Sequence, residues 1–399
     1  MEQPVGPFAD PFETTERRAL AATVARFTSE RIIPHLQEWE DAGELPRELH
    51  REAAGVGLLG LGYPVEFGGS GGDVIDITVM TEALLGAGGS GGLFASLFSL
   101  GIAVPHIIDA VRRREAAGDA AGAAWLDDQF VRPALAGETI AALGVTEPDG
   151  GSDVARLHTR ARPQGDDWII NGAKTYITSG VRANVVVIAA RIGAPGASGI
   201  SLFAVDTATP GFSVTRRLDK MGWQCSDTAE LSLVDCRVPA AALLTPNPGD
   251  GFASLARHFA TERLSLATLG YSTAARCYDL ALAWTRHRET FGRPLATRQV
   301  VRHDLVEMYR QIDVARSYTR KVAVKIAGGQ DAVLEAVLAK NTAVAACEYV
   351  VDRAVQLFGG AGYMRGSEVE RHYRDARILG IGGGATEVMT DLAAKLLAL

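Results

Sequence analysis

One glutamate lies within the apolar stripe of a predicted helix in the last third of the chain. After Gly251 the apolar residues recur at helical spacing, at Phe252, Leu255, Phe259, Leu266 and Leu269. Glu262 falls on the same stripe, and a buried carboxylate is costly unless it is paired or used. Desolvation would raise its pKa from about 4.3 towards that of a useful general base. Glu262 is therefore a candidate proton acceptor, and an ion pair with Arg263 or Arg257 is the structural alternative.

A second stretch, Leu143 to Gly180, combines small hydroxyl residues with glycines. The hydroxyls of Thr146, Ser152 and Thr178 can donate or accept hydrogen bonds, and glycines let main-chain N–H groups approach a ligand closely. The stretch predicts a surface for a flat ligand that carries phosphates. An ordinary β-hairpin is the alternative, because Asn171-Gly172 is the strongest short turn signal.

The composition limits the class of protein. A chain of 399 residues predicts two or three subdomains, and 47% hydrophobic with 22% charged residues predicts a soluble globule. The formal net charge of -7 argues against a nucleic-acid surface. The four cysteines have no CxxC pair and no metal-ligand spacing, and no secretory signal is visible. We therefore expect the cytoplasm or another reducing compartment.

One uncharged segment, Ala83 to Val104, is long enough to span a bilayer. Glycines between Gly86 and Gly92 break its middle, and it contains too few large apolar residues. We expect it to be buried in the protein, with no membrane span.

Three successive segments with different periodicity are expected to position the candidate groups in an α+β fold. Residues 1–140 predict helices, from about Thr14 to Pro34 and over Pro46–Ala54. Residues 141–247 predict a β domain with strands at Val185–Ile188, Ile200–Val205 and Leu231–Val234. Residues 248–399 predict a helical bundle, with apolar seams along a helix from about Gln299 and along another through Val333–Val351.

Five segments together resemble the acyl-CoA dehydrogenase family over nearly the whole chain. They are VTEPDGGSD, NGAKTYITSG, RHRETFGRP, QLFGGAGY and YRDARILGIGGGATEVM. The resemblance implies an N-terminal helical domain, a middle β-barrel-like domain, a C-terminal four-helix bundle and FAD as cofactor. A nicotinamide cofactor is not indicated, because no GxGxxG opens a βαβ unit.

The resemblance also implies two groups of FAD-binding residues. The first belongs to the middle domain and has Thr178 near flavin N5: Leu143, Val145, Thr146, Gly151, Ser152, Tyr176 and Thr178. The second lies in the last third: Arg288, Thr290, Phe291, Gln299, Gln356, Leu357, Gly359, Gly360, Thr386 and Glu387. Segments of the second group cross to the flavin of a neighbouring subunit in the family. A homodimer or homotetramer is therefore expected.

The family places its catalytic base at one of two positions. Many members have a glutamate on the loop where this chain has Gly383. The isovaleryl and long-chain branches have glycine there and carry the base in a Glu-Arg pair on the earlier helix, which matches Glu262-Arg263. Gly383 can still offer its backbone N–H to the thioester oxygen. The residues implied for substrate binding are Ser152, Arg263, Leu93, Phe94, Leu97 and Phe98.

Two positions depart from the family pattern. Ala385 replaces a threonine that is usual beside the flavin, which weakens a cofactor contact. Ala260 stands where many members carry an aspartate near CoA, so the acyl carrier can be CoA or a carrier protein.

The resemblance implies an FAD-dependent acyl-CoA dehydrogenase that forms a trans-2-enoyl thioester, with an electron-transfer flavoprotein as reoxidant. One alternative keeps the fold but acts as a flavin-dependent monooxygenase, or dehydrogenates a carrier-protein-bound acyl group in a biosynthetic pathway. An alternative of another class is a non-catalytic subunit of a mixed oligomer.

Overall fold

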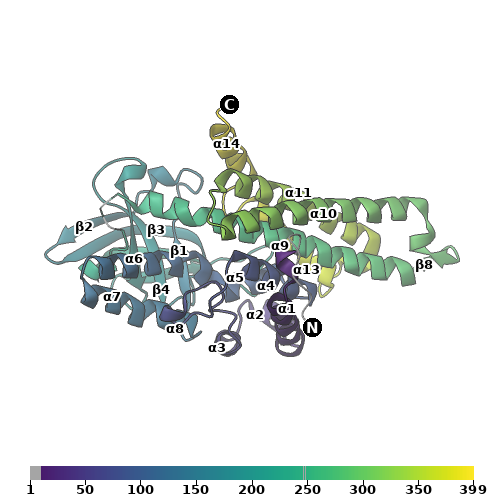
Figure 1. Cartoon of the computed structure of the whole chain (residues 1–399), viewed down its shortest axis with the longest axis horizontal. Coiled ribbons are helices and arrows are strands. Elements are labelled where there is room, and N and C mark those ends of the chain that lie inside the picture. The colour runs from purple at the N-terminus through teal and green to yellow at the C-terminus, as the bar shows by residue number, and fades with distance from the viewer. Residues whose placement is uncertain (1–9, 246, 248) are drawn as a thin grey trace. The chain divides into compact units, whose positions relative to one another are not determined.

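The computed structural model describes residues 10–245, 247 and 249–399, which form two compact units (Figure 1). The first unit contains the described residues up to Glu38, with Gly71–Gly91 and Arg263–Leu399. The second unit contains Trp39–Ser70 and Gly92–Glu262. Helices precede and follow a middle sheet along the chain, so the predicted α+β order of helical, β and helical segments is confirmed.

Long helices dominate the first unit, and Figure 1 shows α10 and α11 side by side. The predicted seam of α10 is buried at Leu305, Met308 and Ile312. A short β8–β9 hairpin follows α9. The elements are α1 (Thr15–Phe27), α4 (Val74–Gly86), the end of α9 (Gly251–His287), β8 (Glu289–Thr290), β9 (Arg293–Pro294), α10 (Gln299–Ala327), α11 (Val333–Phe358), α12 (Gly360–Tyr363), α13 (Glu368–Ala376) and α14 (Thr386–Leu396).

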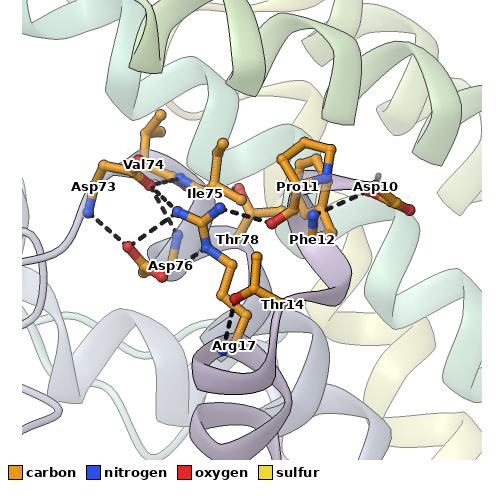
Figure 2. A network of polar contacts seen from close by, with 10 residues as sticks. All are labelled: Asp10, Pro11, Phe12, Thr14, Arg17, Asp73, Val74, Ile75, Asp76 and Thr78. Atoms are coloured by element: carbon orange, nitrogen blue, oxygen red, sulfur yellow. Dashed lines mark hydrogen bonds and ion pairs between the residues drawn. The ribbon is translucent and has the colours of Figure 1, made fainter. Parts of the chain in front are cut away.

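A polar network around Arg17 fixes the N-terminal helices of this unit (Figure 2). The Arg17 guanidinium donates to Asp76 at 2.8 Å, to Asp73 at 3.0 Å and to the carbonyl of Pro11 at 2.7 Å. Asp73 and Asp76 also form a capping box that satisfies the first N–H groups of α4. Burial alone would raise the pKa of Asp76, but Arg17 holds it below its usual value. One cation thus joins the starts of α1 and α4.

A sheet forms the core of the second unit. Its strand order is β1-β4-β2-β3-β7-β6, and β5 pairs with the other edge of β4. The strands are β1 (Ala141–Gly144), β2 (Arg160–Gln164), β3 (Asp167–Thr178), β4 (Val185–Arg191), β5 (Ile200–Asp206), β6 (Phe212–Arg217) and β7 (Thr228–Pro239). The helices of this unit are α3 (Arg47–Gly55), α5 (Gly91–Leu97), α6 (Val104–Ala116), α7 (Ala120–Leu126), α8 (Arg132–Leu135) and the start of α9, and α2 (Leu36–Ala42) spans both units.

The hairpin predicted at Asn171-Gly172 is wrong. Strand β3 continues through both residues, and the turn that joins it to β2 lies at Gly165. Gly172 is needed for close packing instead, because a Cβ there would lie 2.7 Å from the Cα of Thr159. The Asn171 side chain accepts from the backbone N–H of Asp235 on β7 at 2.8 Å. Asn171-Gly172 therefore lies at a crowded, irregular point within a long strand, although the same dipeptide is common in turns.

The uncharged segment from Ala83 to Val104 is divided among helices, because α4 ends at Gly86 and α5 begins at Gly91. Among the described residues no helix has the length and apolar character needed to cross a membrane.

A buried ion pair ties the turn after β1 to strand β3. Lys174 on β3 is fully buried, and its ammonium lies 2.7 Å from the carboxylate of Glu147. Burial lowers the pKa of Lys174 to about 8, so it stays protonated at neutral pH. Burial would raise the pKa of Glu147, but the charge of Lys174 holds it below its usual value. Both partners are therefore charged inside the protein.

Replacing Asp73 with alanine should destabilise the protein by about 1–2 kcal/mol, because α4 loses its N-cap. The midpoint of thermal unfolding measures this loss. Glu13→Ala is the matched control, since Glu13 lies 3.9 Å from Arg18 in an exposed pair. An equal loss in both variants would contradict the role of the cap.

The folded-state pKa of Asp76 is below its unfolded value, so the contribution of Asp76 to stability is present at neutral pH. That contribution is lost as the pH falls through the folded-state pKa.

Lys174→Met should destabilise the protein by about 3–5 kcal/mol, because it leaves the buried Glu147 carboxylate without its cation. Adding Glu147→Gln should recover part of the loss, since the remaining group is then neutral. Arg216→Met is the control on the same sheet, because Arg216 and Glu230 form a more exposed pair. Denaturant unfolding of the variants measures the differences. A control that loses as much as Lys174→Met would contradict the special cost of the buried pair.

Candidate functional site

The hydroxyl-bearing residues singled out in the second unit lie around the ends of β1 and β3. The backbone N–H of Thr175 donates to the carbonyl of Thr146 at 3.0 Å, and Lys174 donates to the carbonyl of Val145 at 3.1 Å. The chain that leaves β1 therefore runs beside β3. Leu143 is half-buried on β1, as are Val145 and Thr146 beyond it.

The loop after Thr146 is exposed to solvent, and hydrogen bonds to the Glu147 carboxylate hold its far end. The Glu147 carboxylate accepts from the backbone N–H groups of His158, at 2.5 Å, and Thr159, at 2.9 Å. Gly151 and Ser152 between these anchors are exposed. A Cβ on Gly151 would lie 3.3 Å from the Thr146 methyl group, so glycine leaves the surface beside Thr146 open.

A β-bulge turns Tyr176 out of the sheet. The register of β3 against β7 shifts between Lys174 and Ile177, and Tyr176 adopts a left-handed φ of 58°. The tyrosine ring is 70% exposed, whereas Thr178 is half-buried and pairs with Thr228 of β7. Bulges often re-aim side chains next to functional sites.

The turn after Thr178 is held by an ion pair between the buried Asp227 and the nearly buried Arg182. The Asp227 carboxylate accepts from Arg182 Nε and from the backbone N–H of Val181, both at 2.8 Å. Arg182 also donates to the Ser96 hydroxyl on α5 at 2.9 Å. The same guanidinium thus connects the end of β3 with α5.

Helix α5 carries most of the residues expected to line an acyl chain. Leu93 and Leu97 are fully buried, while Phe94 and the following Phe98 are half-buried with ring centroids 5.3 Å apart. Because Arg182 connects α5 to the turn after Thr178, the second unit brings the two predicted groups of residues together.

Glu262 is half-buried on α9, and Arg263 is buried beside it. Of the predicted stripe, Leu255 and Leu269 are buried, whereas Phe252 is exposed. Arg257, one candidate for an ion pair with Glu262, lies 3.8 Å from Asp109 on α6.

Polar contacts with α6 hold the first turns of α9. His258, one helical turn before Glu262, lies 3.0 Å from Asp109, and Ser254 lies 3.1 Å from the ring of His106. Burial, with His258 nearby, lowers the pKa of His106 to about 3, so its ring is neutral at neutral pH. These contacts fix the position of the helical turn that carries Glu262.

In the first unit, one predicted segment surrounds the β8–β9 hairpin. Arg288 and Gln299 are exposed, and Thr290 is half-buried. Phe291 is 97% exposed and has a φ of 51°. The Arg298 guanidinium donates to the Thr290 hydroxyl at 3.1 Å and lies 5.4 Å from the Phe291 ring centroid. A large apolar side chain is thus held out into solvent on a defined hairpin.

The second predicted segment of this unit lies where α11 ends. Gln356 is exposed and Leu357 half-buried, and a Cβ on Gly359 or Gly360 would meet open space. Phe358 stacks on Trp284 of α9 with ring centroids 4.7 Å apart and planes 12° apart. This stack fixes the end of α11 against α9, close in sequence to Arg288.

The predicted loop residue Gly383 is half-buried between the 3-10 turn Arg377–Gly380 and α14. Its φ is 63°, a left-handed conformation that favours glycine. Thr386 is half-buried at the start of α14, where Asn341 donates to its carbonyl at 3.2 Å, and Glu387 is exposed.

The chemistry of these residues fits FAD. Hydroxyl donors and open main chain at Thr146, Gly151 and Ser152 suit a flat, phosphate-bearing ligand, as do the open glycines Gly359 and Gly360. Exposed Arg288 adds a cation suited to phosphate.

Sequence reasoning missed the buried and nearly buried charges that hold these surfaces: Glu147, Lys174, Arg182, Asp227 and Lys340. Glu147 and Lys174 stand within the quoted VTEPDGGSD and NGAKTYITSG segments, and a lysine in the middle of a strand was the available signal. No comparable pattern marked Arg182 or Lys340.

Comparisons with known proteins agree with this architecture. Three family models match: the acyl-CoA dehydrogenase N-terminal domain over residues 14–111, the middle domain over 142–236 and the C-terminal domain over 249–398. The chain is 33% identical to probable acyl-CoA dehydrogenase YngJ of Bacillus subtilis, covering 96% of this chain and 98% of that protein. It is 34% identical to the mitochondrial long-chain specific acyl-CoA dehydrogenase of Rattus norvegicus, covering 96% and 86%.

Solved structures give the same result. A probable acyl-CoA dehydrogenase from Mycobacterium abscessus superposes with a TM-score of 0.92 at 56% identity, covering 97% of this chain and 100% of that one. A glutaryl-CoA dehydrogenase from Mycobacterium smegmatis, solved with FADH2, superposes with a TM-score of 0.86 at 26% identity, covering 98% and 96%. The protein is thus an FAD-dependent oxidoreductase, and the chain belongs to the acyl-CoA dehydrogenase family.

Proposed function

We propose that this enzyme dehydrogenates an acyl thioester at its α and β carbons, giving the trans-2-enoyl thioester. The observation that carries the proposal is a half-buried carboxylate, Glu262, next to the buried Arg263 in a chain that has glycine at position 383. Glu262 takes the α-proton onto its carboxylate as the α C–H bond breaks. FAD, when bound, would supply the acceptor for the hydride that leaves the β-carbon.

Gly383 contributes a backbone N–H to the thioester oxygen, where negative charge develops as the α-proton leaves. Its φ of 63° is a left-handed conformation that favours glycine, and glycine puts no side chain beside this N–H. Arg263 and Ser152 are the proposed polar contacts of the substrate. Leu93, Phe94, Leu97 and Phe98 are the proposed acyl-chain wall, with the half-buried Phe94 and Phe98 having the surface to contact it.

The flavin is held by two sets of residues in this proposal. Main chain and hydroxyls of the middle domain, from Leu143 to Thr178, bind it within one subunit. The segments around Arg288, Phe291 and Gln356 bind it from a neighbouring subunit. The high exposure of Phe291 supports this part, because aromatic residues are enriched in protein–protein interfaces. A separate electron-transfer flavoprotein then takes the electrons from the reduced enzyme.

The alternative is an oxygen-dependent reaction on the same fold. The requirement for a base distinguishes the proposed dehydrogenation from this alternative. An oxygen-using relative does not need Glu262 to remove an α-proton. Anaerobic bleaching of the flavin by an acyl-CoA supports the dehydrogenase, and absence of bleaching with a series of chain lengths supports the alternative. The same series, offered as CoA and as carrier-protein thioesters, identifies the carrier.

The test of the base is Glu262→Gln. Glutamine keeps the size of glutamate but cannot take a proton, so flavin reduction by substrate should slow by roughly 100- to 10,000-fold. Stopped-flow absorbance under anaerobic conditions measures the rate, and FAD content and substrate binding should stay near wild type. Glu48→Gln is the matched control, since Glu48 is exposed and lies 3.8 Å from Arg51 on α3. Near-normal reduction by Glu262→Gln would refute the assignment.

The test of the shared flavin site uses Arg288→Ala and Phe291→Ala. Loss of a charged contact to phosphate costs about 1.5–3 kcal/mol, so Arg288→Ala should lower FAD occupancy. Phe291→Ala should shift the assembly towards smaller species, because it removes apolar surface from the interface. Light scattering gives the mass, and the ratio of flavin to protein absorbance gives the occupancy. A wild-type monomer with full FAD would contradict the shared site.

A further inference from the structure

Lys340 is a fully buried lysine on α11 that the proposed chemistry does not use. Its ammonium donates to the carbonyl oxygen of Gly382 at 2.7 Å and also to the carbonyl oxygen of Gly384. These two carbonyls flank Gly383, the residue whose N–H is proposed to meet the thioester oxygen. A buried ammonium is costly unless polar groups surround it, so these contacts are a strong constraint on the loop.

Other contacts besides those of Lys340 also constrain the glycine loop, residues 382–384. Gly383 and Gly384 have φ values of 63° and 97°, and a Cβ on Gly384 would collide with the buried Met389 of α14. Asn341, next to Lys340, donates to the carbonyl of Thr386 and to the hydroxyl of Thr390, both at 3.2 Å. Two neighbouring residues of α11 therefore hold the glycine loop and the first turn of α14.

The direction of the Gly383 N–H follows from peptide geometry. The carbonyl of Gly382 and the N–H of Gly383 belong to the same planar peptide group, which is trans like the other described peptide bonds. In a trans peptide the C=O and the N–H point in opposite directions. Because Lys340 holds the carbonyl, the Gly383 N–H must point away from Lys340.

We propose that Lys340 is a positioning residue that orients and polarises the Gly383 N–H towards the substrate oxygen. A cation on the carbonyl draws electron density from the peptide group and makes its N–H a stronger donor. Lys340 thereby stabilises the charge on the thioester oxygen through one peptide group, without contact with the substrate. The inference rests on the proposed function, since it assigns a task to the same N–H.

The test separates proton removal from flavin chemistry. The probe is an acyl-CoA whose β-carbon is replaced by sulfur, which can lose its α-proton but cannot give up a β-hydride. The measurement is the rate of α-deuterium incorporation from D2O with holoenzyme, followed by mass spectrometry. Lys340→Met keeps the aliphatic length and removes the charge, so exchange should fall by about 10- to 100-fold while the probe still binds. Lys340→Gln keeps an N–H donor without the charge and should lose less.

Lys325→Met is the matched control, because Lys325 pairs with Glu335 at a half-exposed site between α10 and α11. It should exchange at the wild-type rate. Unchanged exchange in Lys340→Met with full FAD would overturn the inference, as would failure of both Lys340 variants to fold and take up FAD, which would show a purely structural role. Glu262→Gln distinguishes the two proposals. If it leaves exchange unchanged, the proposed base is wrong. If it abolishes exchange while Lys340→Met does not, only the role of Lys340 is wrong.

Discussion

The Glu147–Lys174 pair is the interaction on which the candidate flavin surface of the second unit depends. Two opposite charges are buried 2.7 Å apart, and the carboxylate also accepts from the backbone of His158 and Thr159. The pair therefore fixes both ends of the loop that carries Gly151 and Ser152, and it fastens that loop to β3. These hydrogen bonds also satisfy the buried carboxylate, which a buried ion pair requires in order to be stable.

The same principle recurs wherever the chain departs from regular structure near a proposed contact. Arg182 and Asp227 hold the turn after Thr178, where Ser179 has a φ of 61°. Lys340 holds the two carbonyls around Gly383. In each case a buried or nearly buried cation contacts main chain or a carboxylate at the point where the backbone is left-handed. Strained backbone persists only where its surroundings determine it, so these charges preserve surfaces that local propensity would not form.

The periodicity of the sequence predicted the elements well and the contacts poorly. The seam of α10 at Leu305, Met308 and Ile312 is buried as expected, because helical spacing reports one continuous apolar face. Asn171-Gly172 misled, because a turn dipeptide and a bulge dipeptide need the same small residue for different reasons.

Which groups would meet across long sequence separations was not predictable from spacing. Lys340 and Gly382 are 42 residues apart, and Arg182 and Ser96 are 86 apart. Such contacts depend on how helices and strands pack, and nothing in the local pattern around either residue reports it. The proposed functional residues, Glu262 and Gly383, were identified from a position on a helical stripe and from a resemblance between segments.

The backbone conformation of the loop favours a glutamate at position 262 on α9 over one at position 383. Gly383 has a φ of 63°, where a residue with a side chain pays roughly 1–2 kcal/mol. A glutamate at this position would have to adopt that strained backbone or change it. A change in this φ would alter the orientation of the Gly382–Gly383 peptide group, which carries the Gly382 carbonyl and the Gly383 N–H, relative to the residues that follow. With the proposed base on α9, the loop can keep its left-handed conformation, and the proposed proton acceptor stands on a regular helical backbone. The proposed base and the proposed hydrogen-bond donor then belong to separate elements, so the backbone conformation of one does not constrain that of the other.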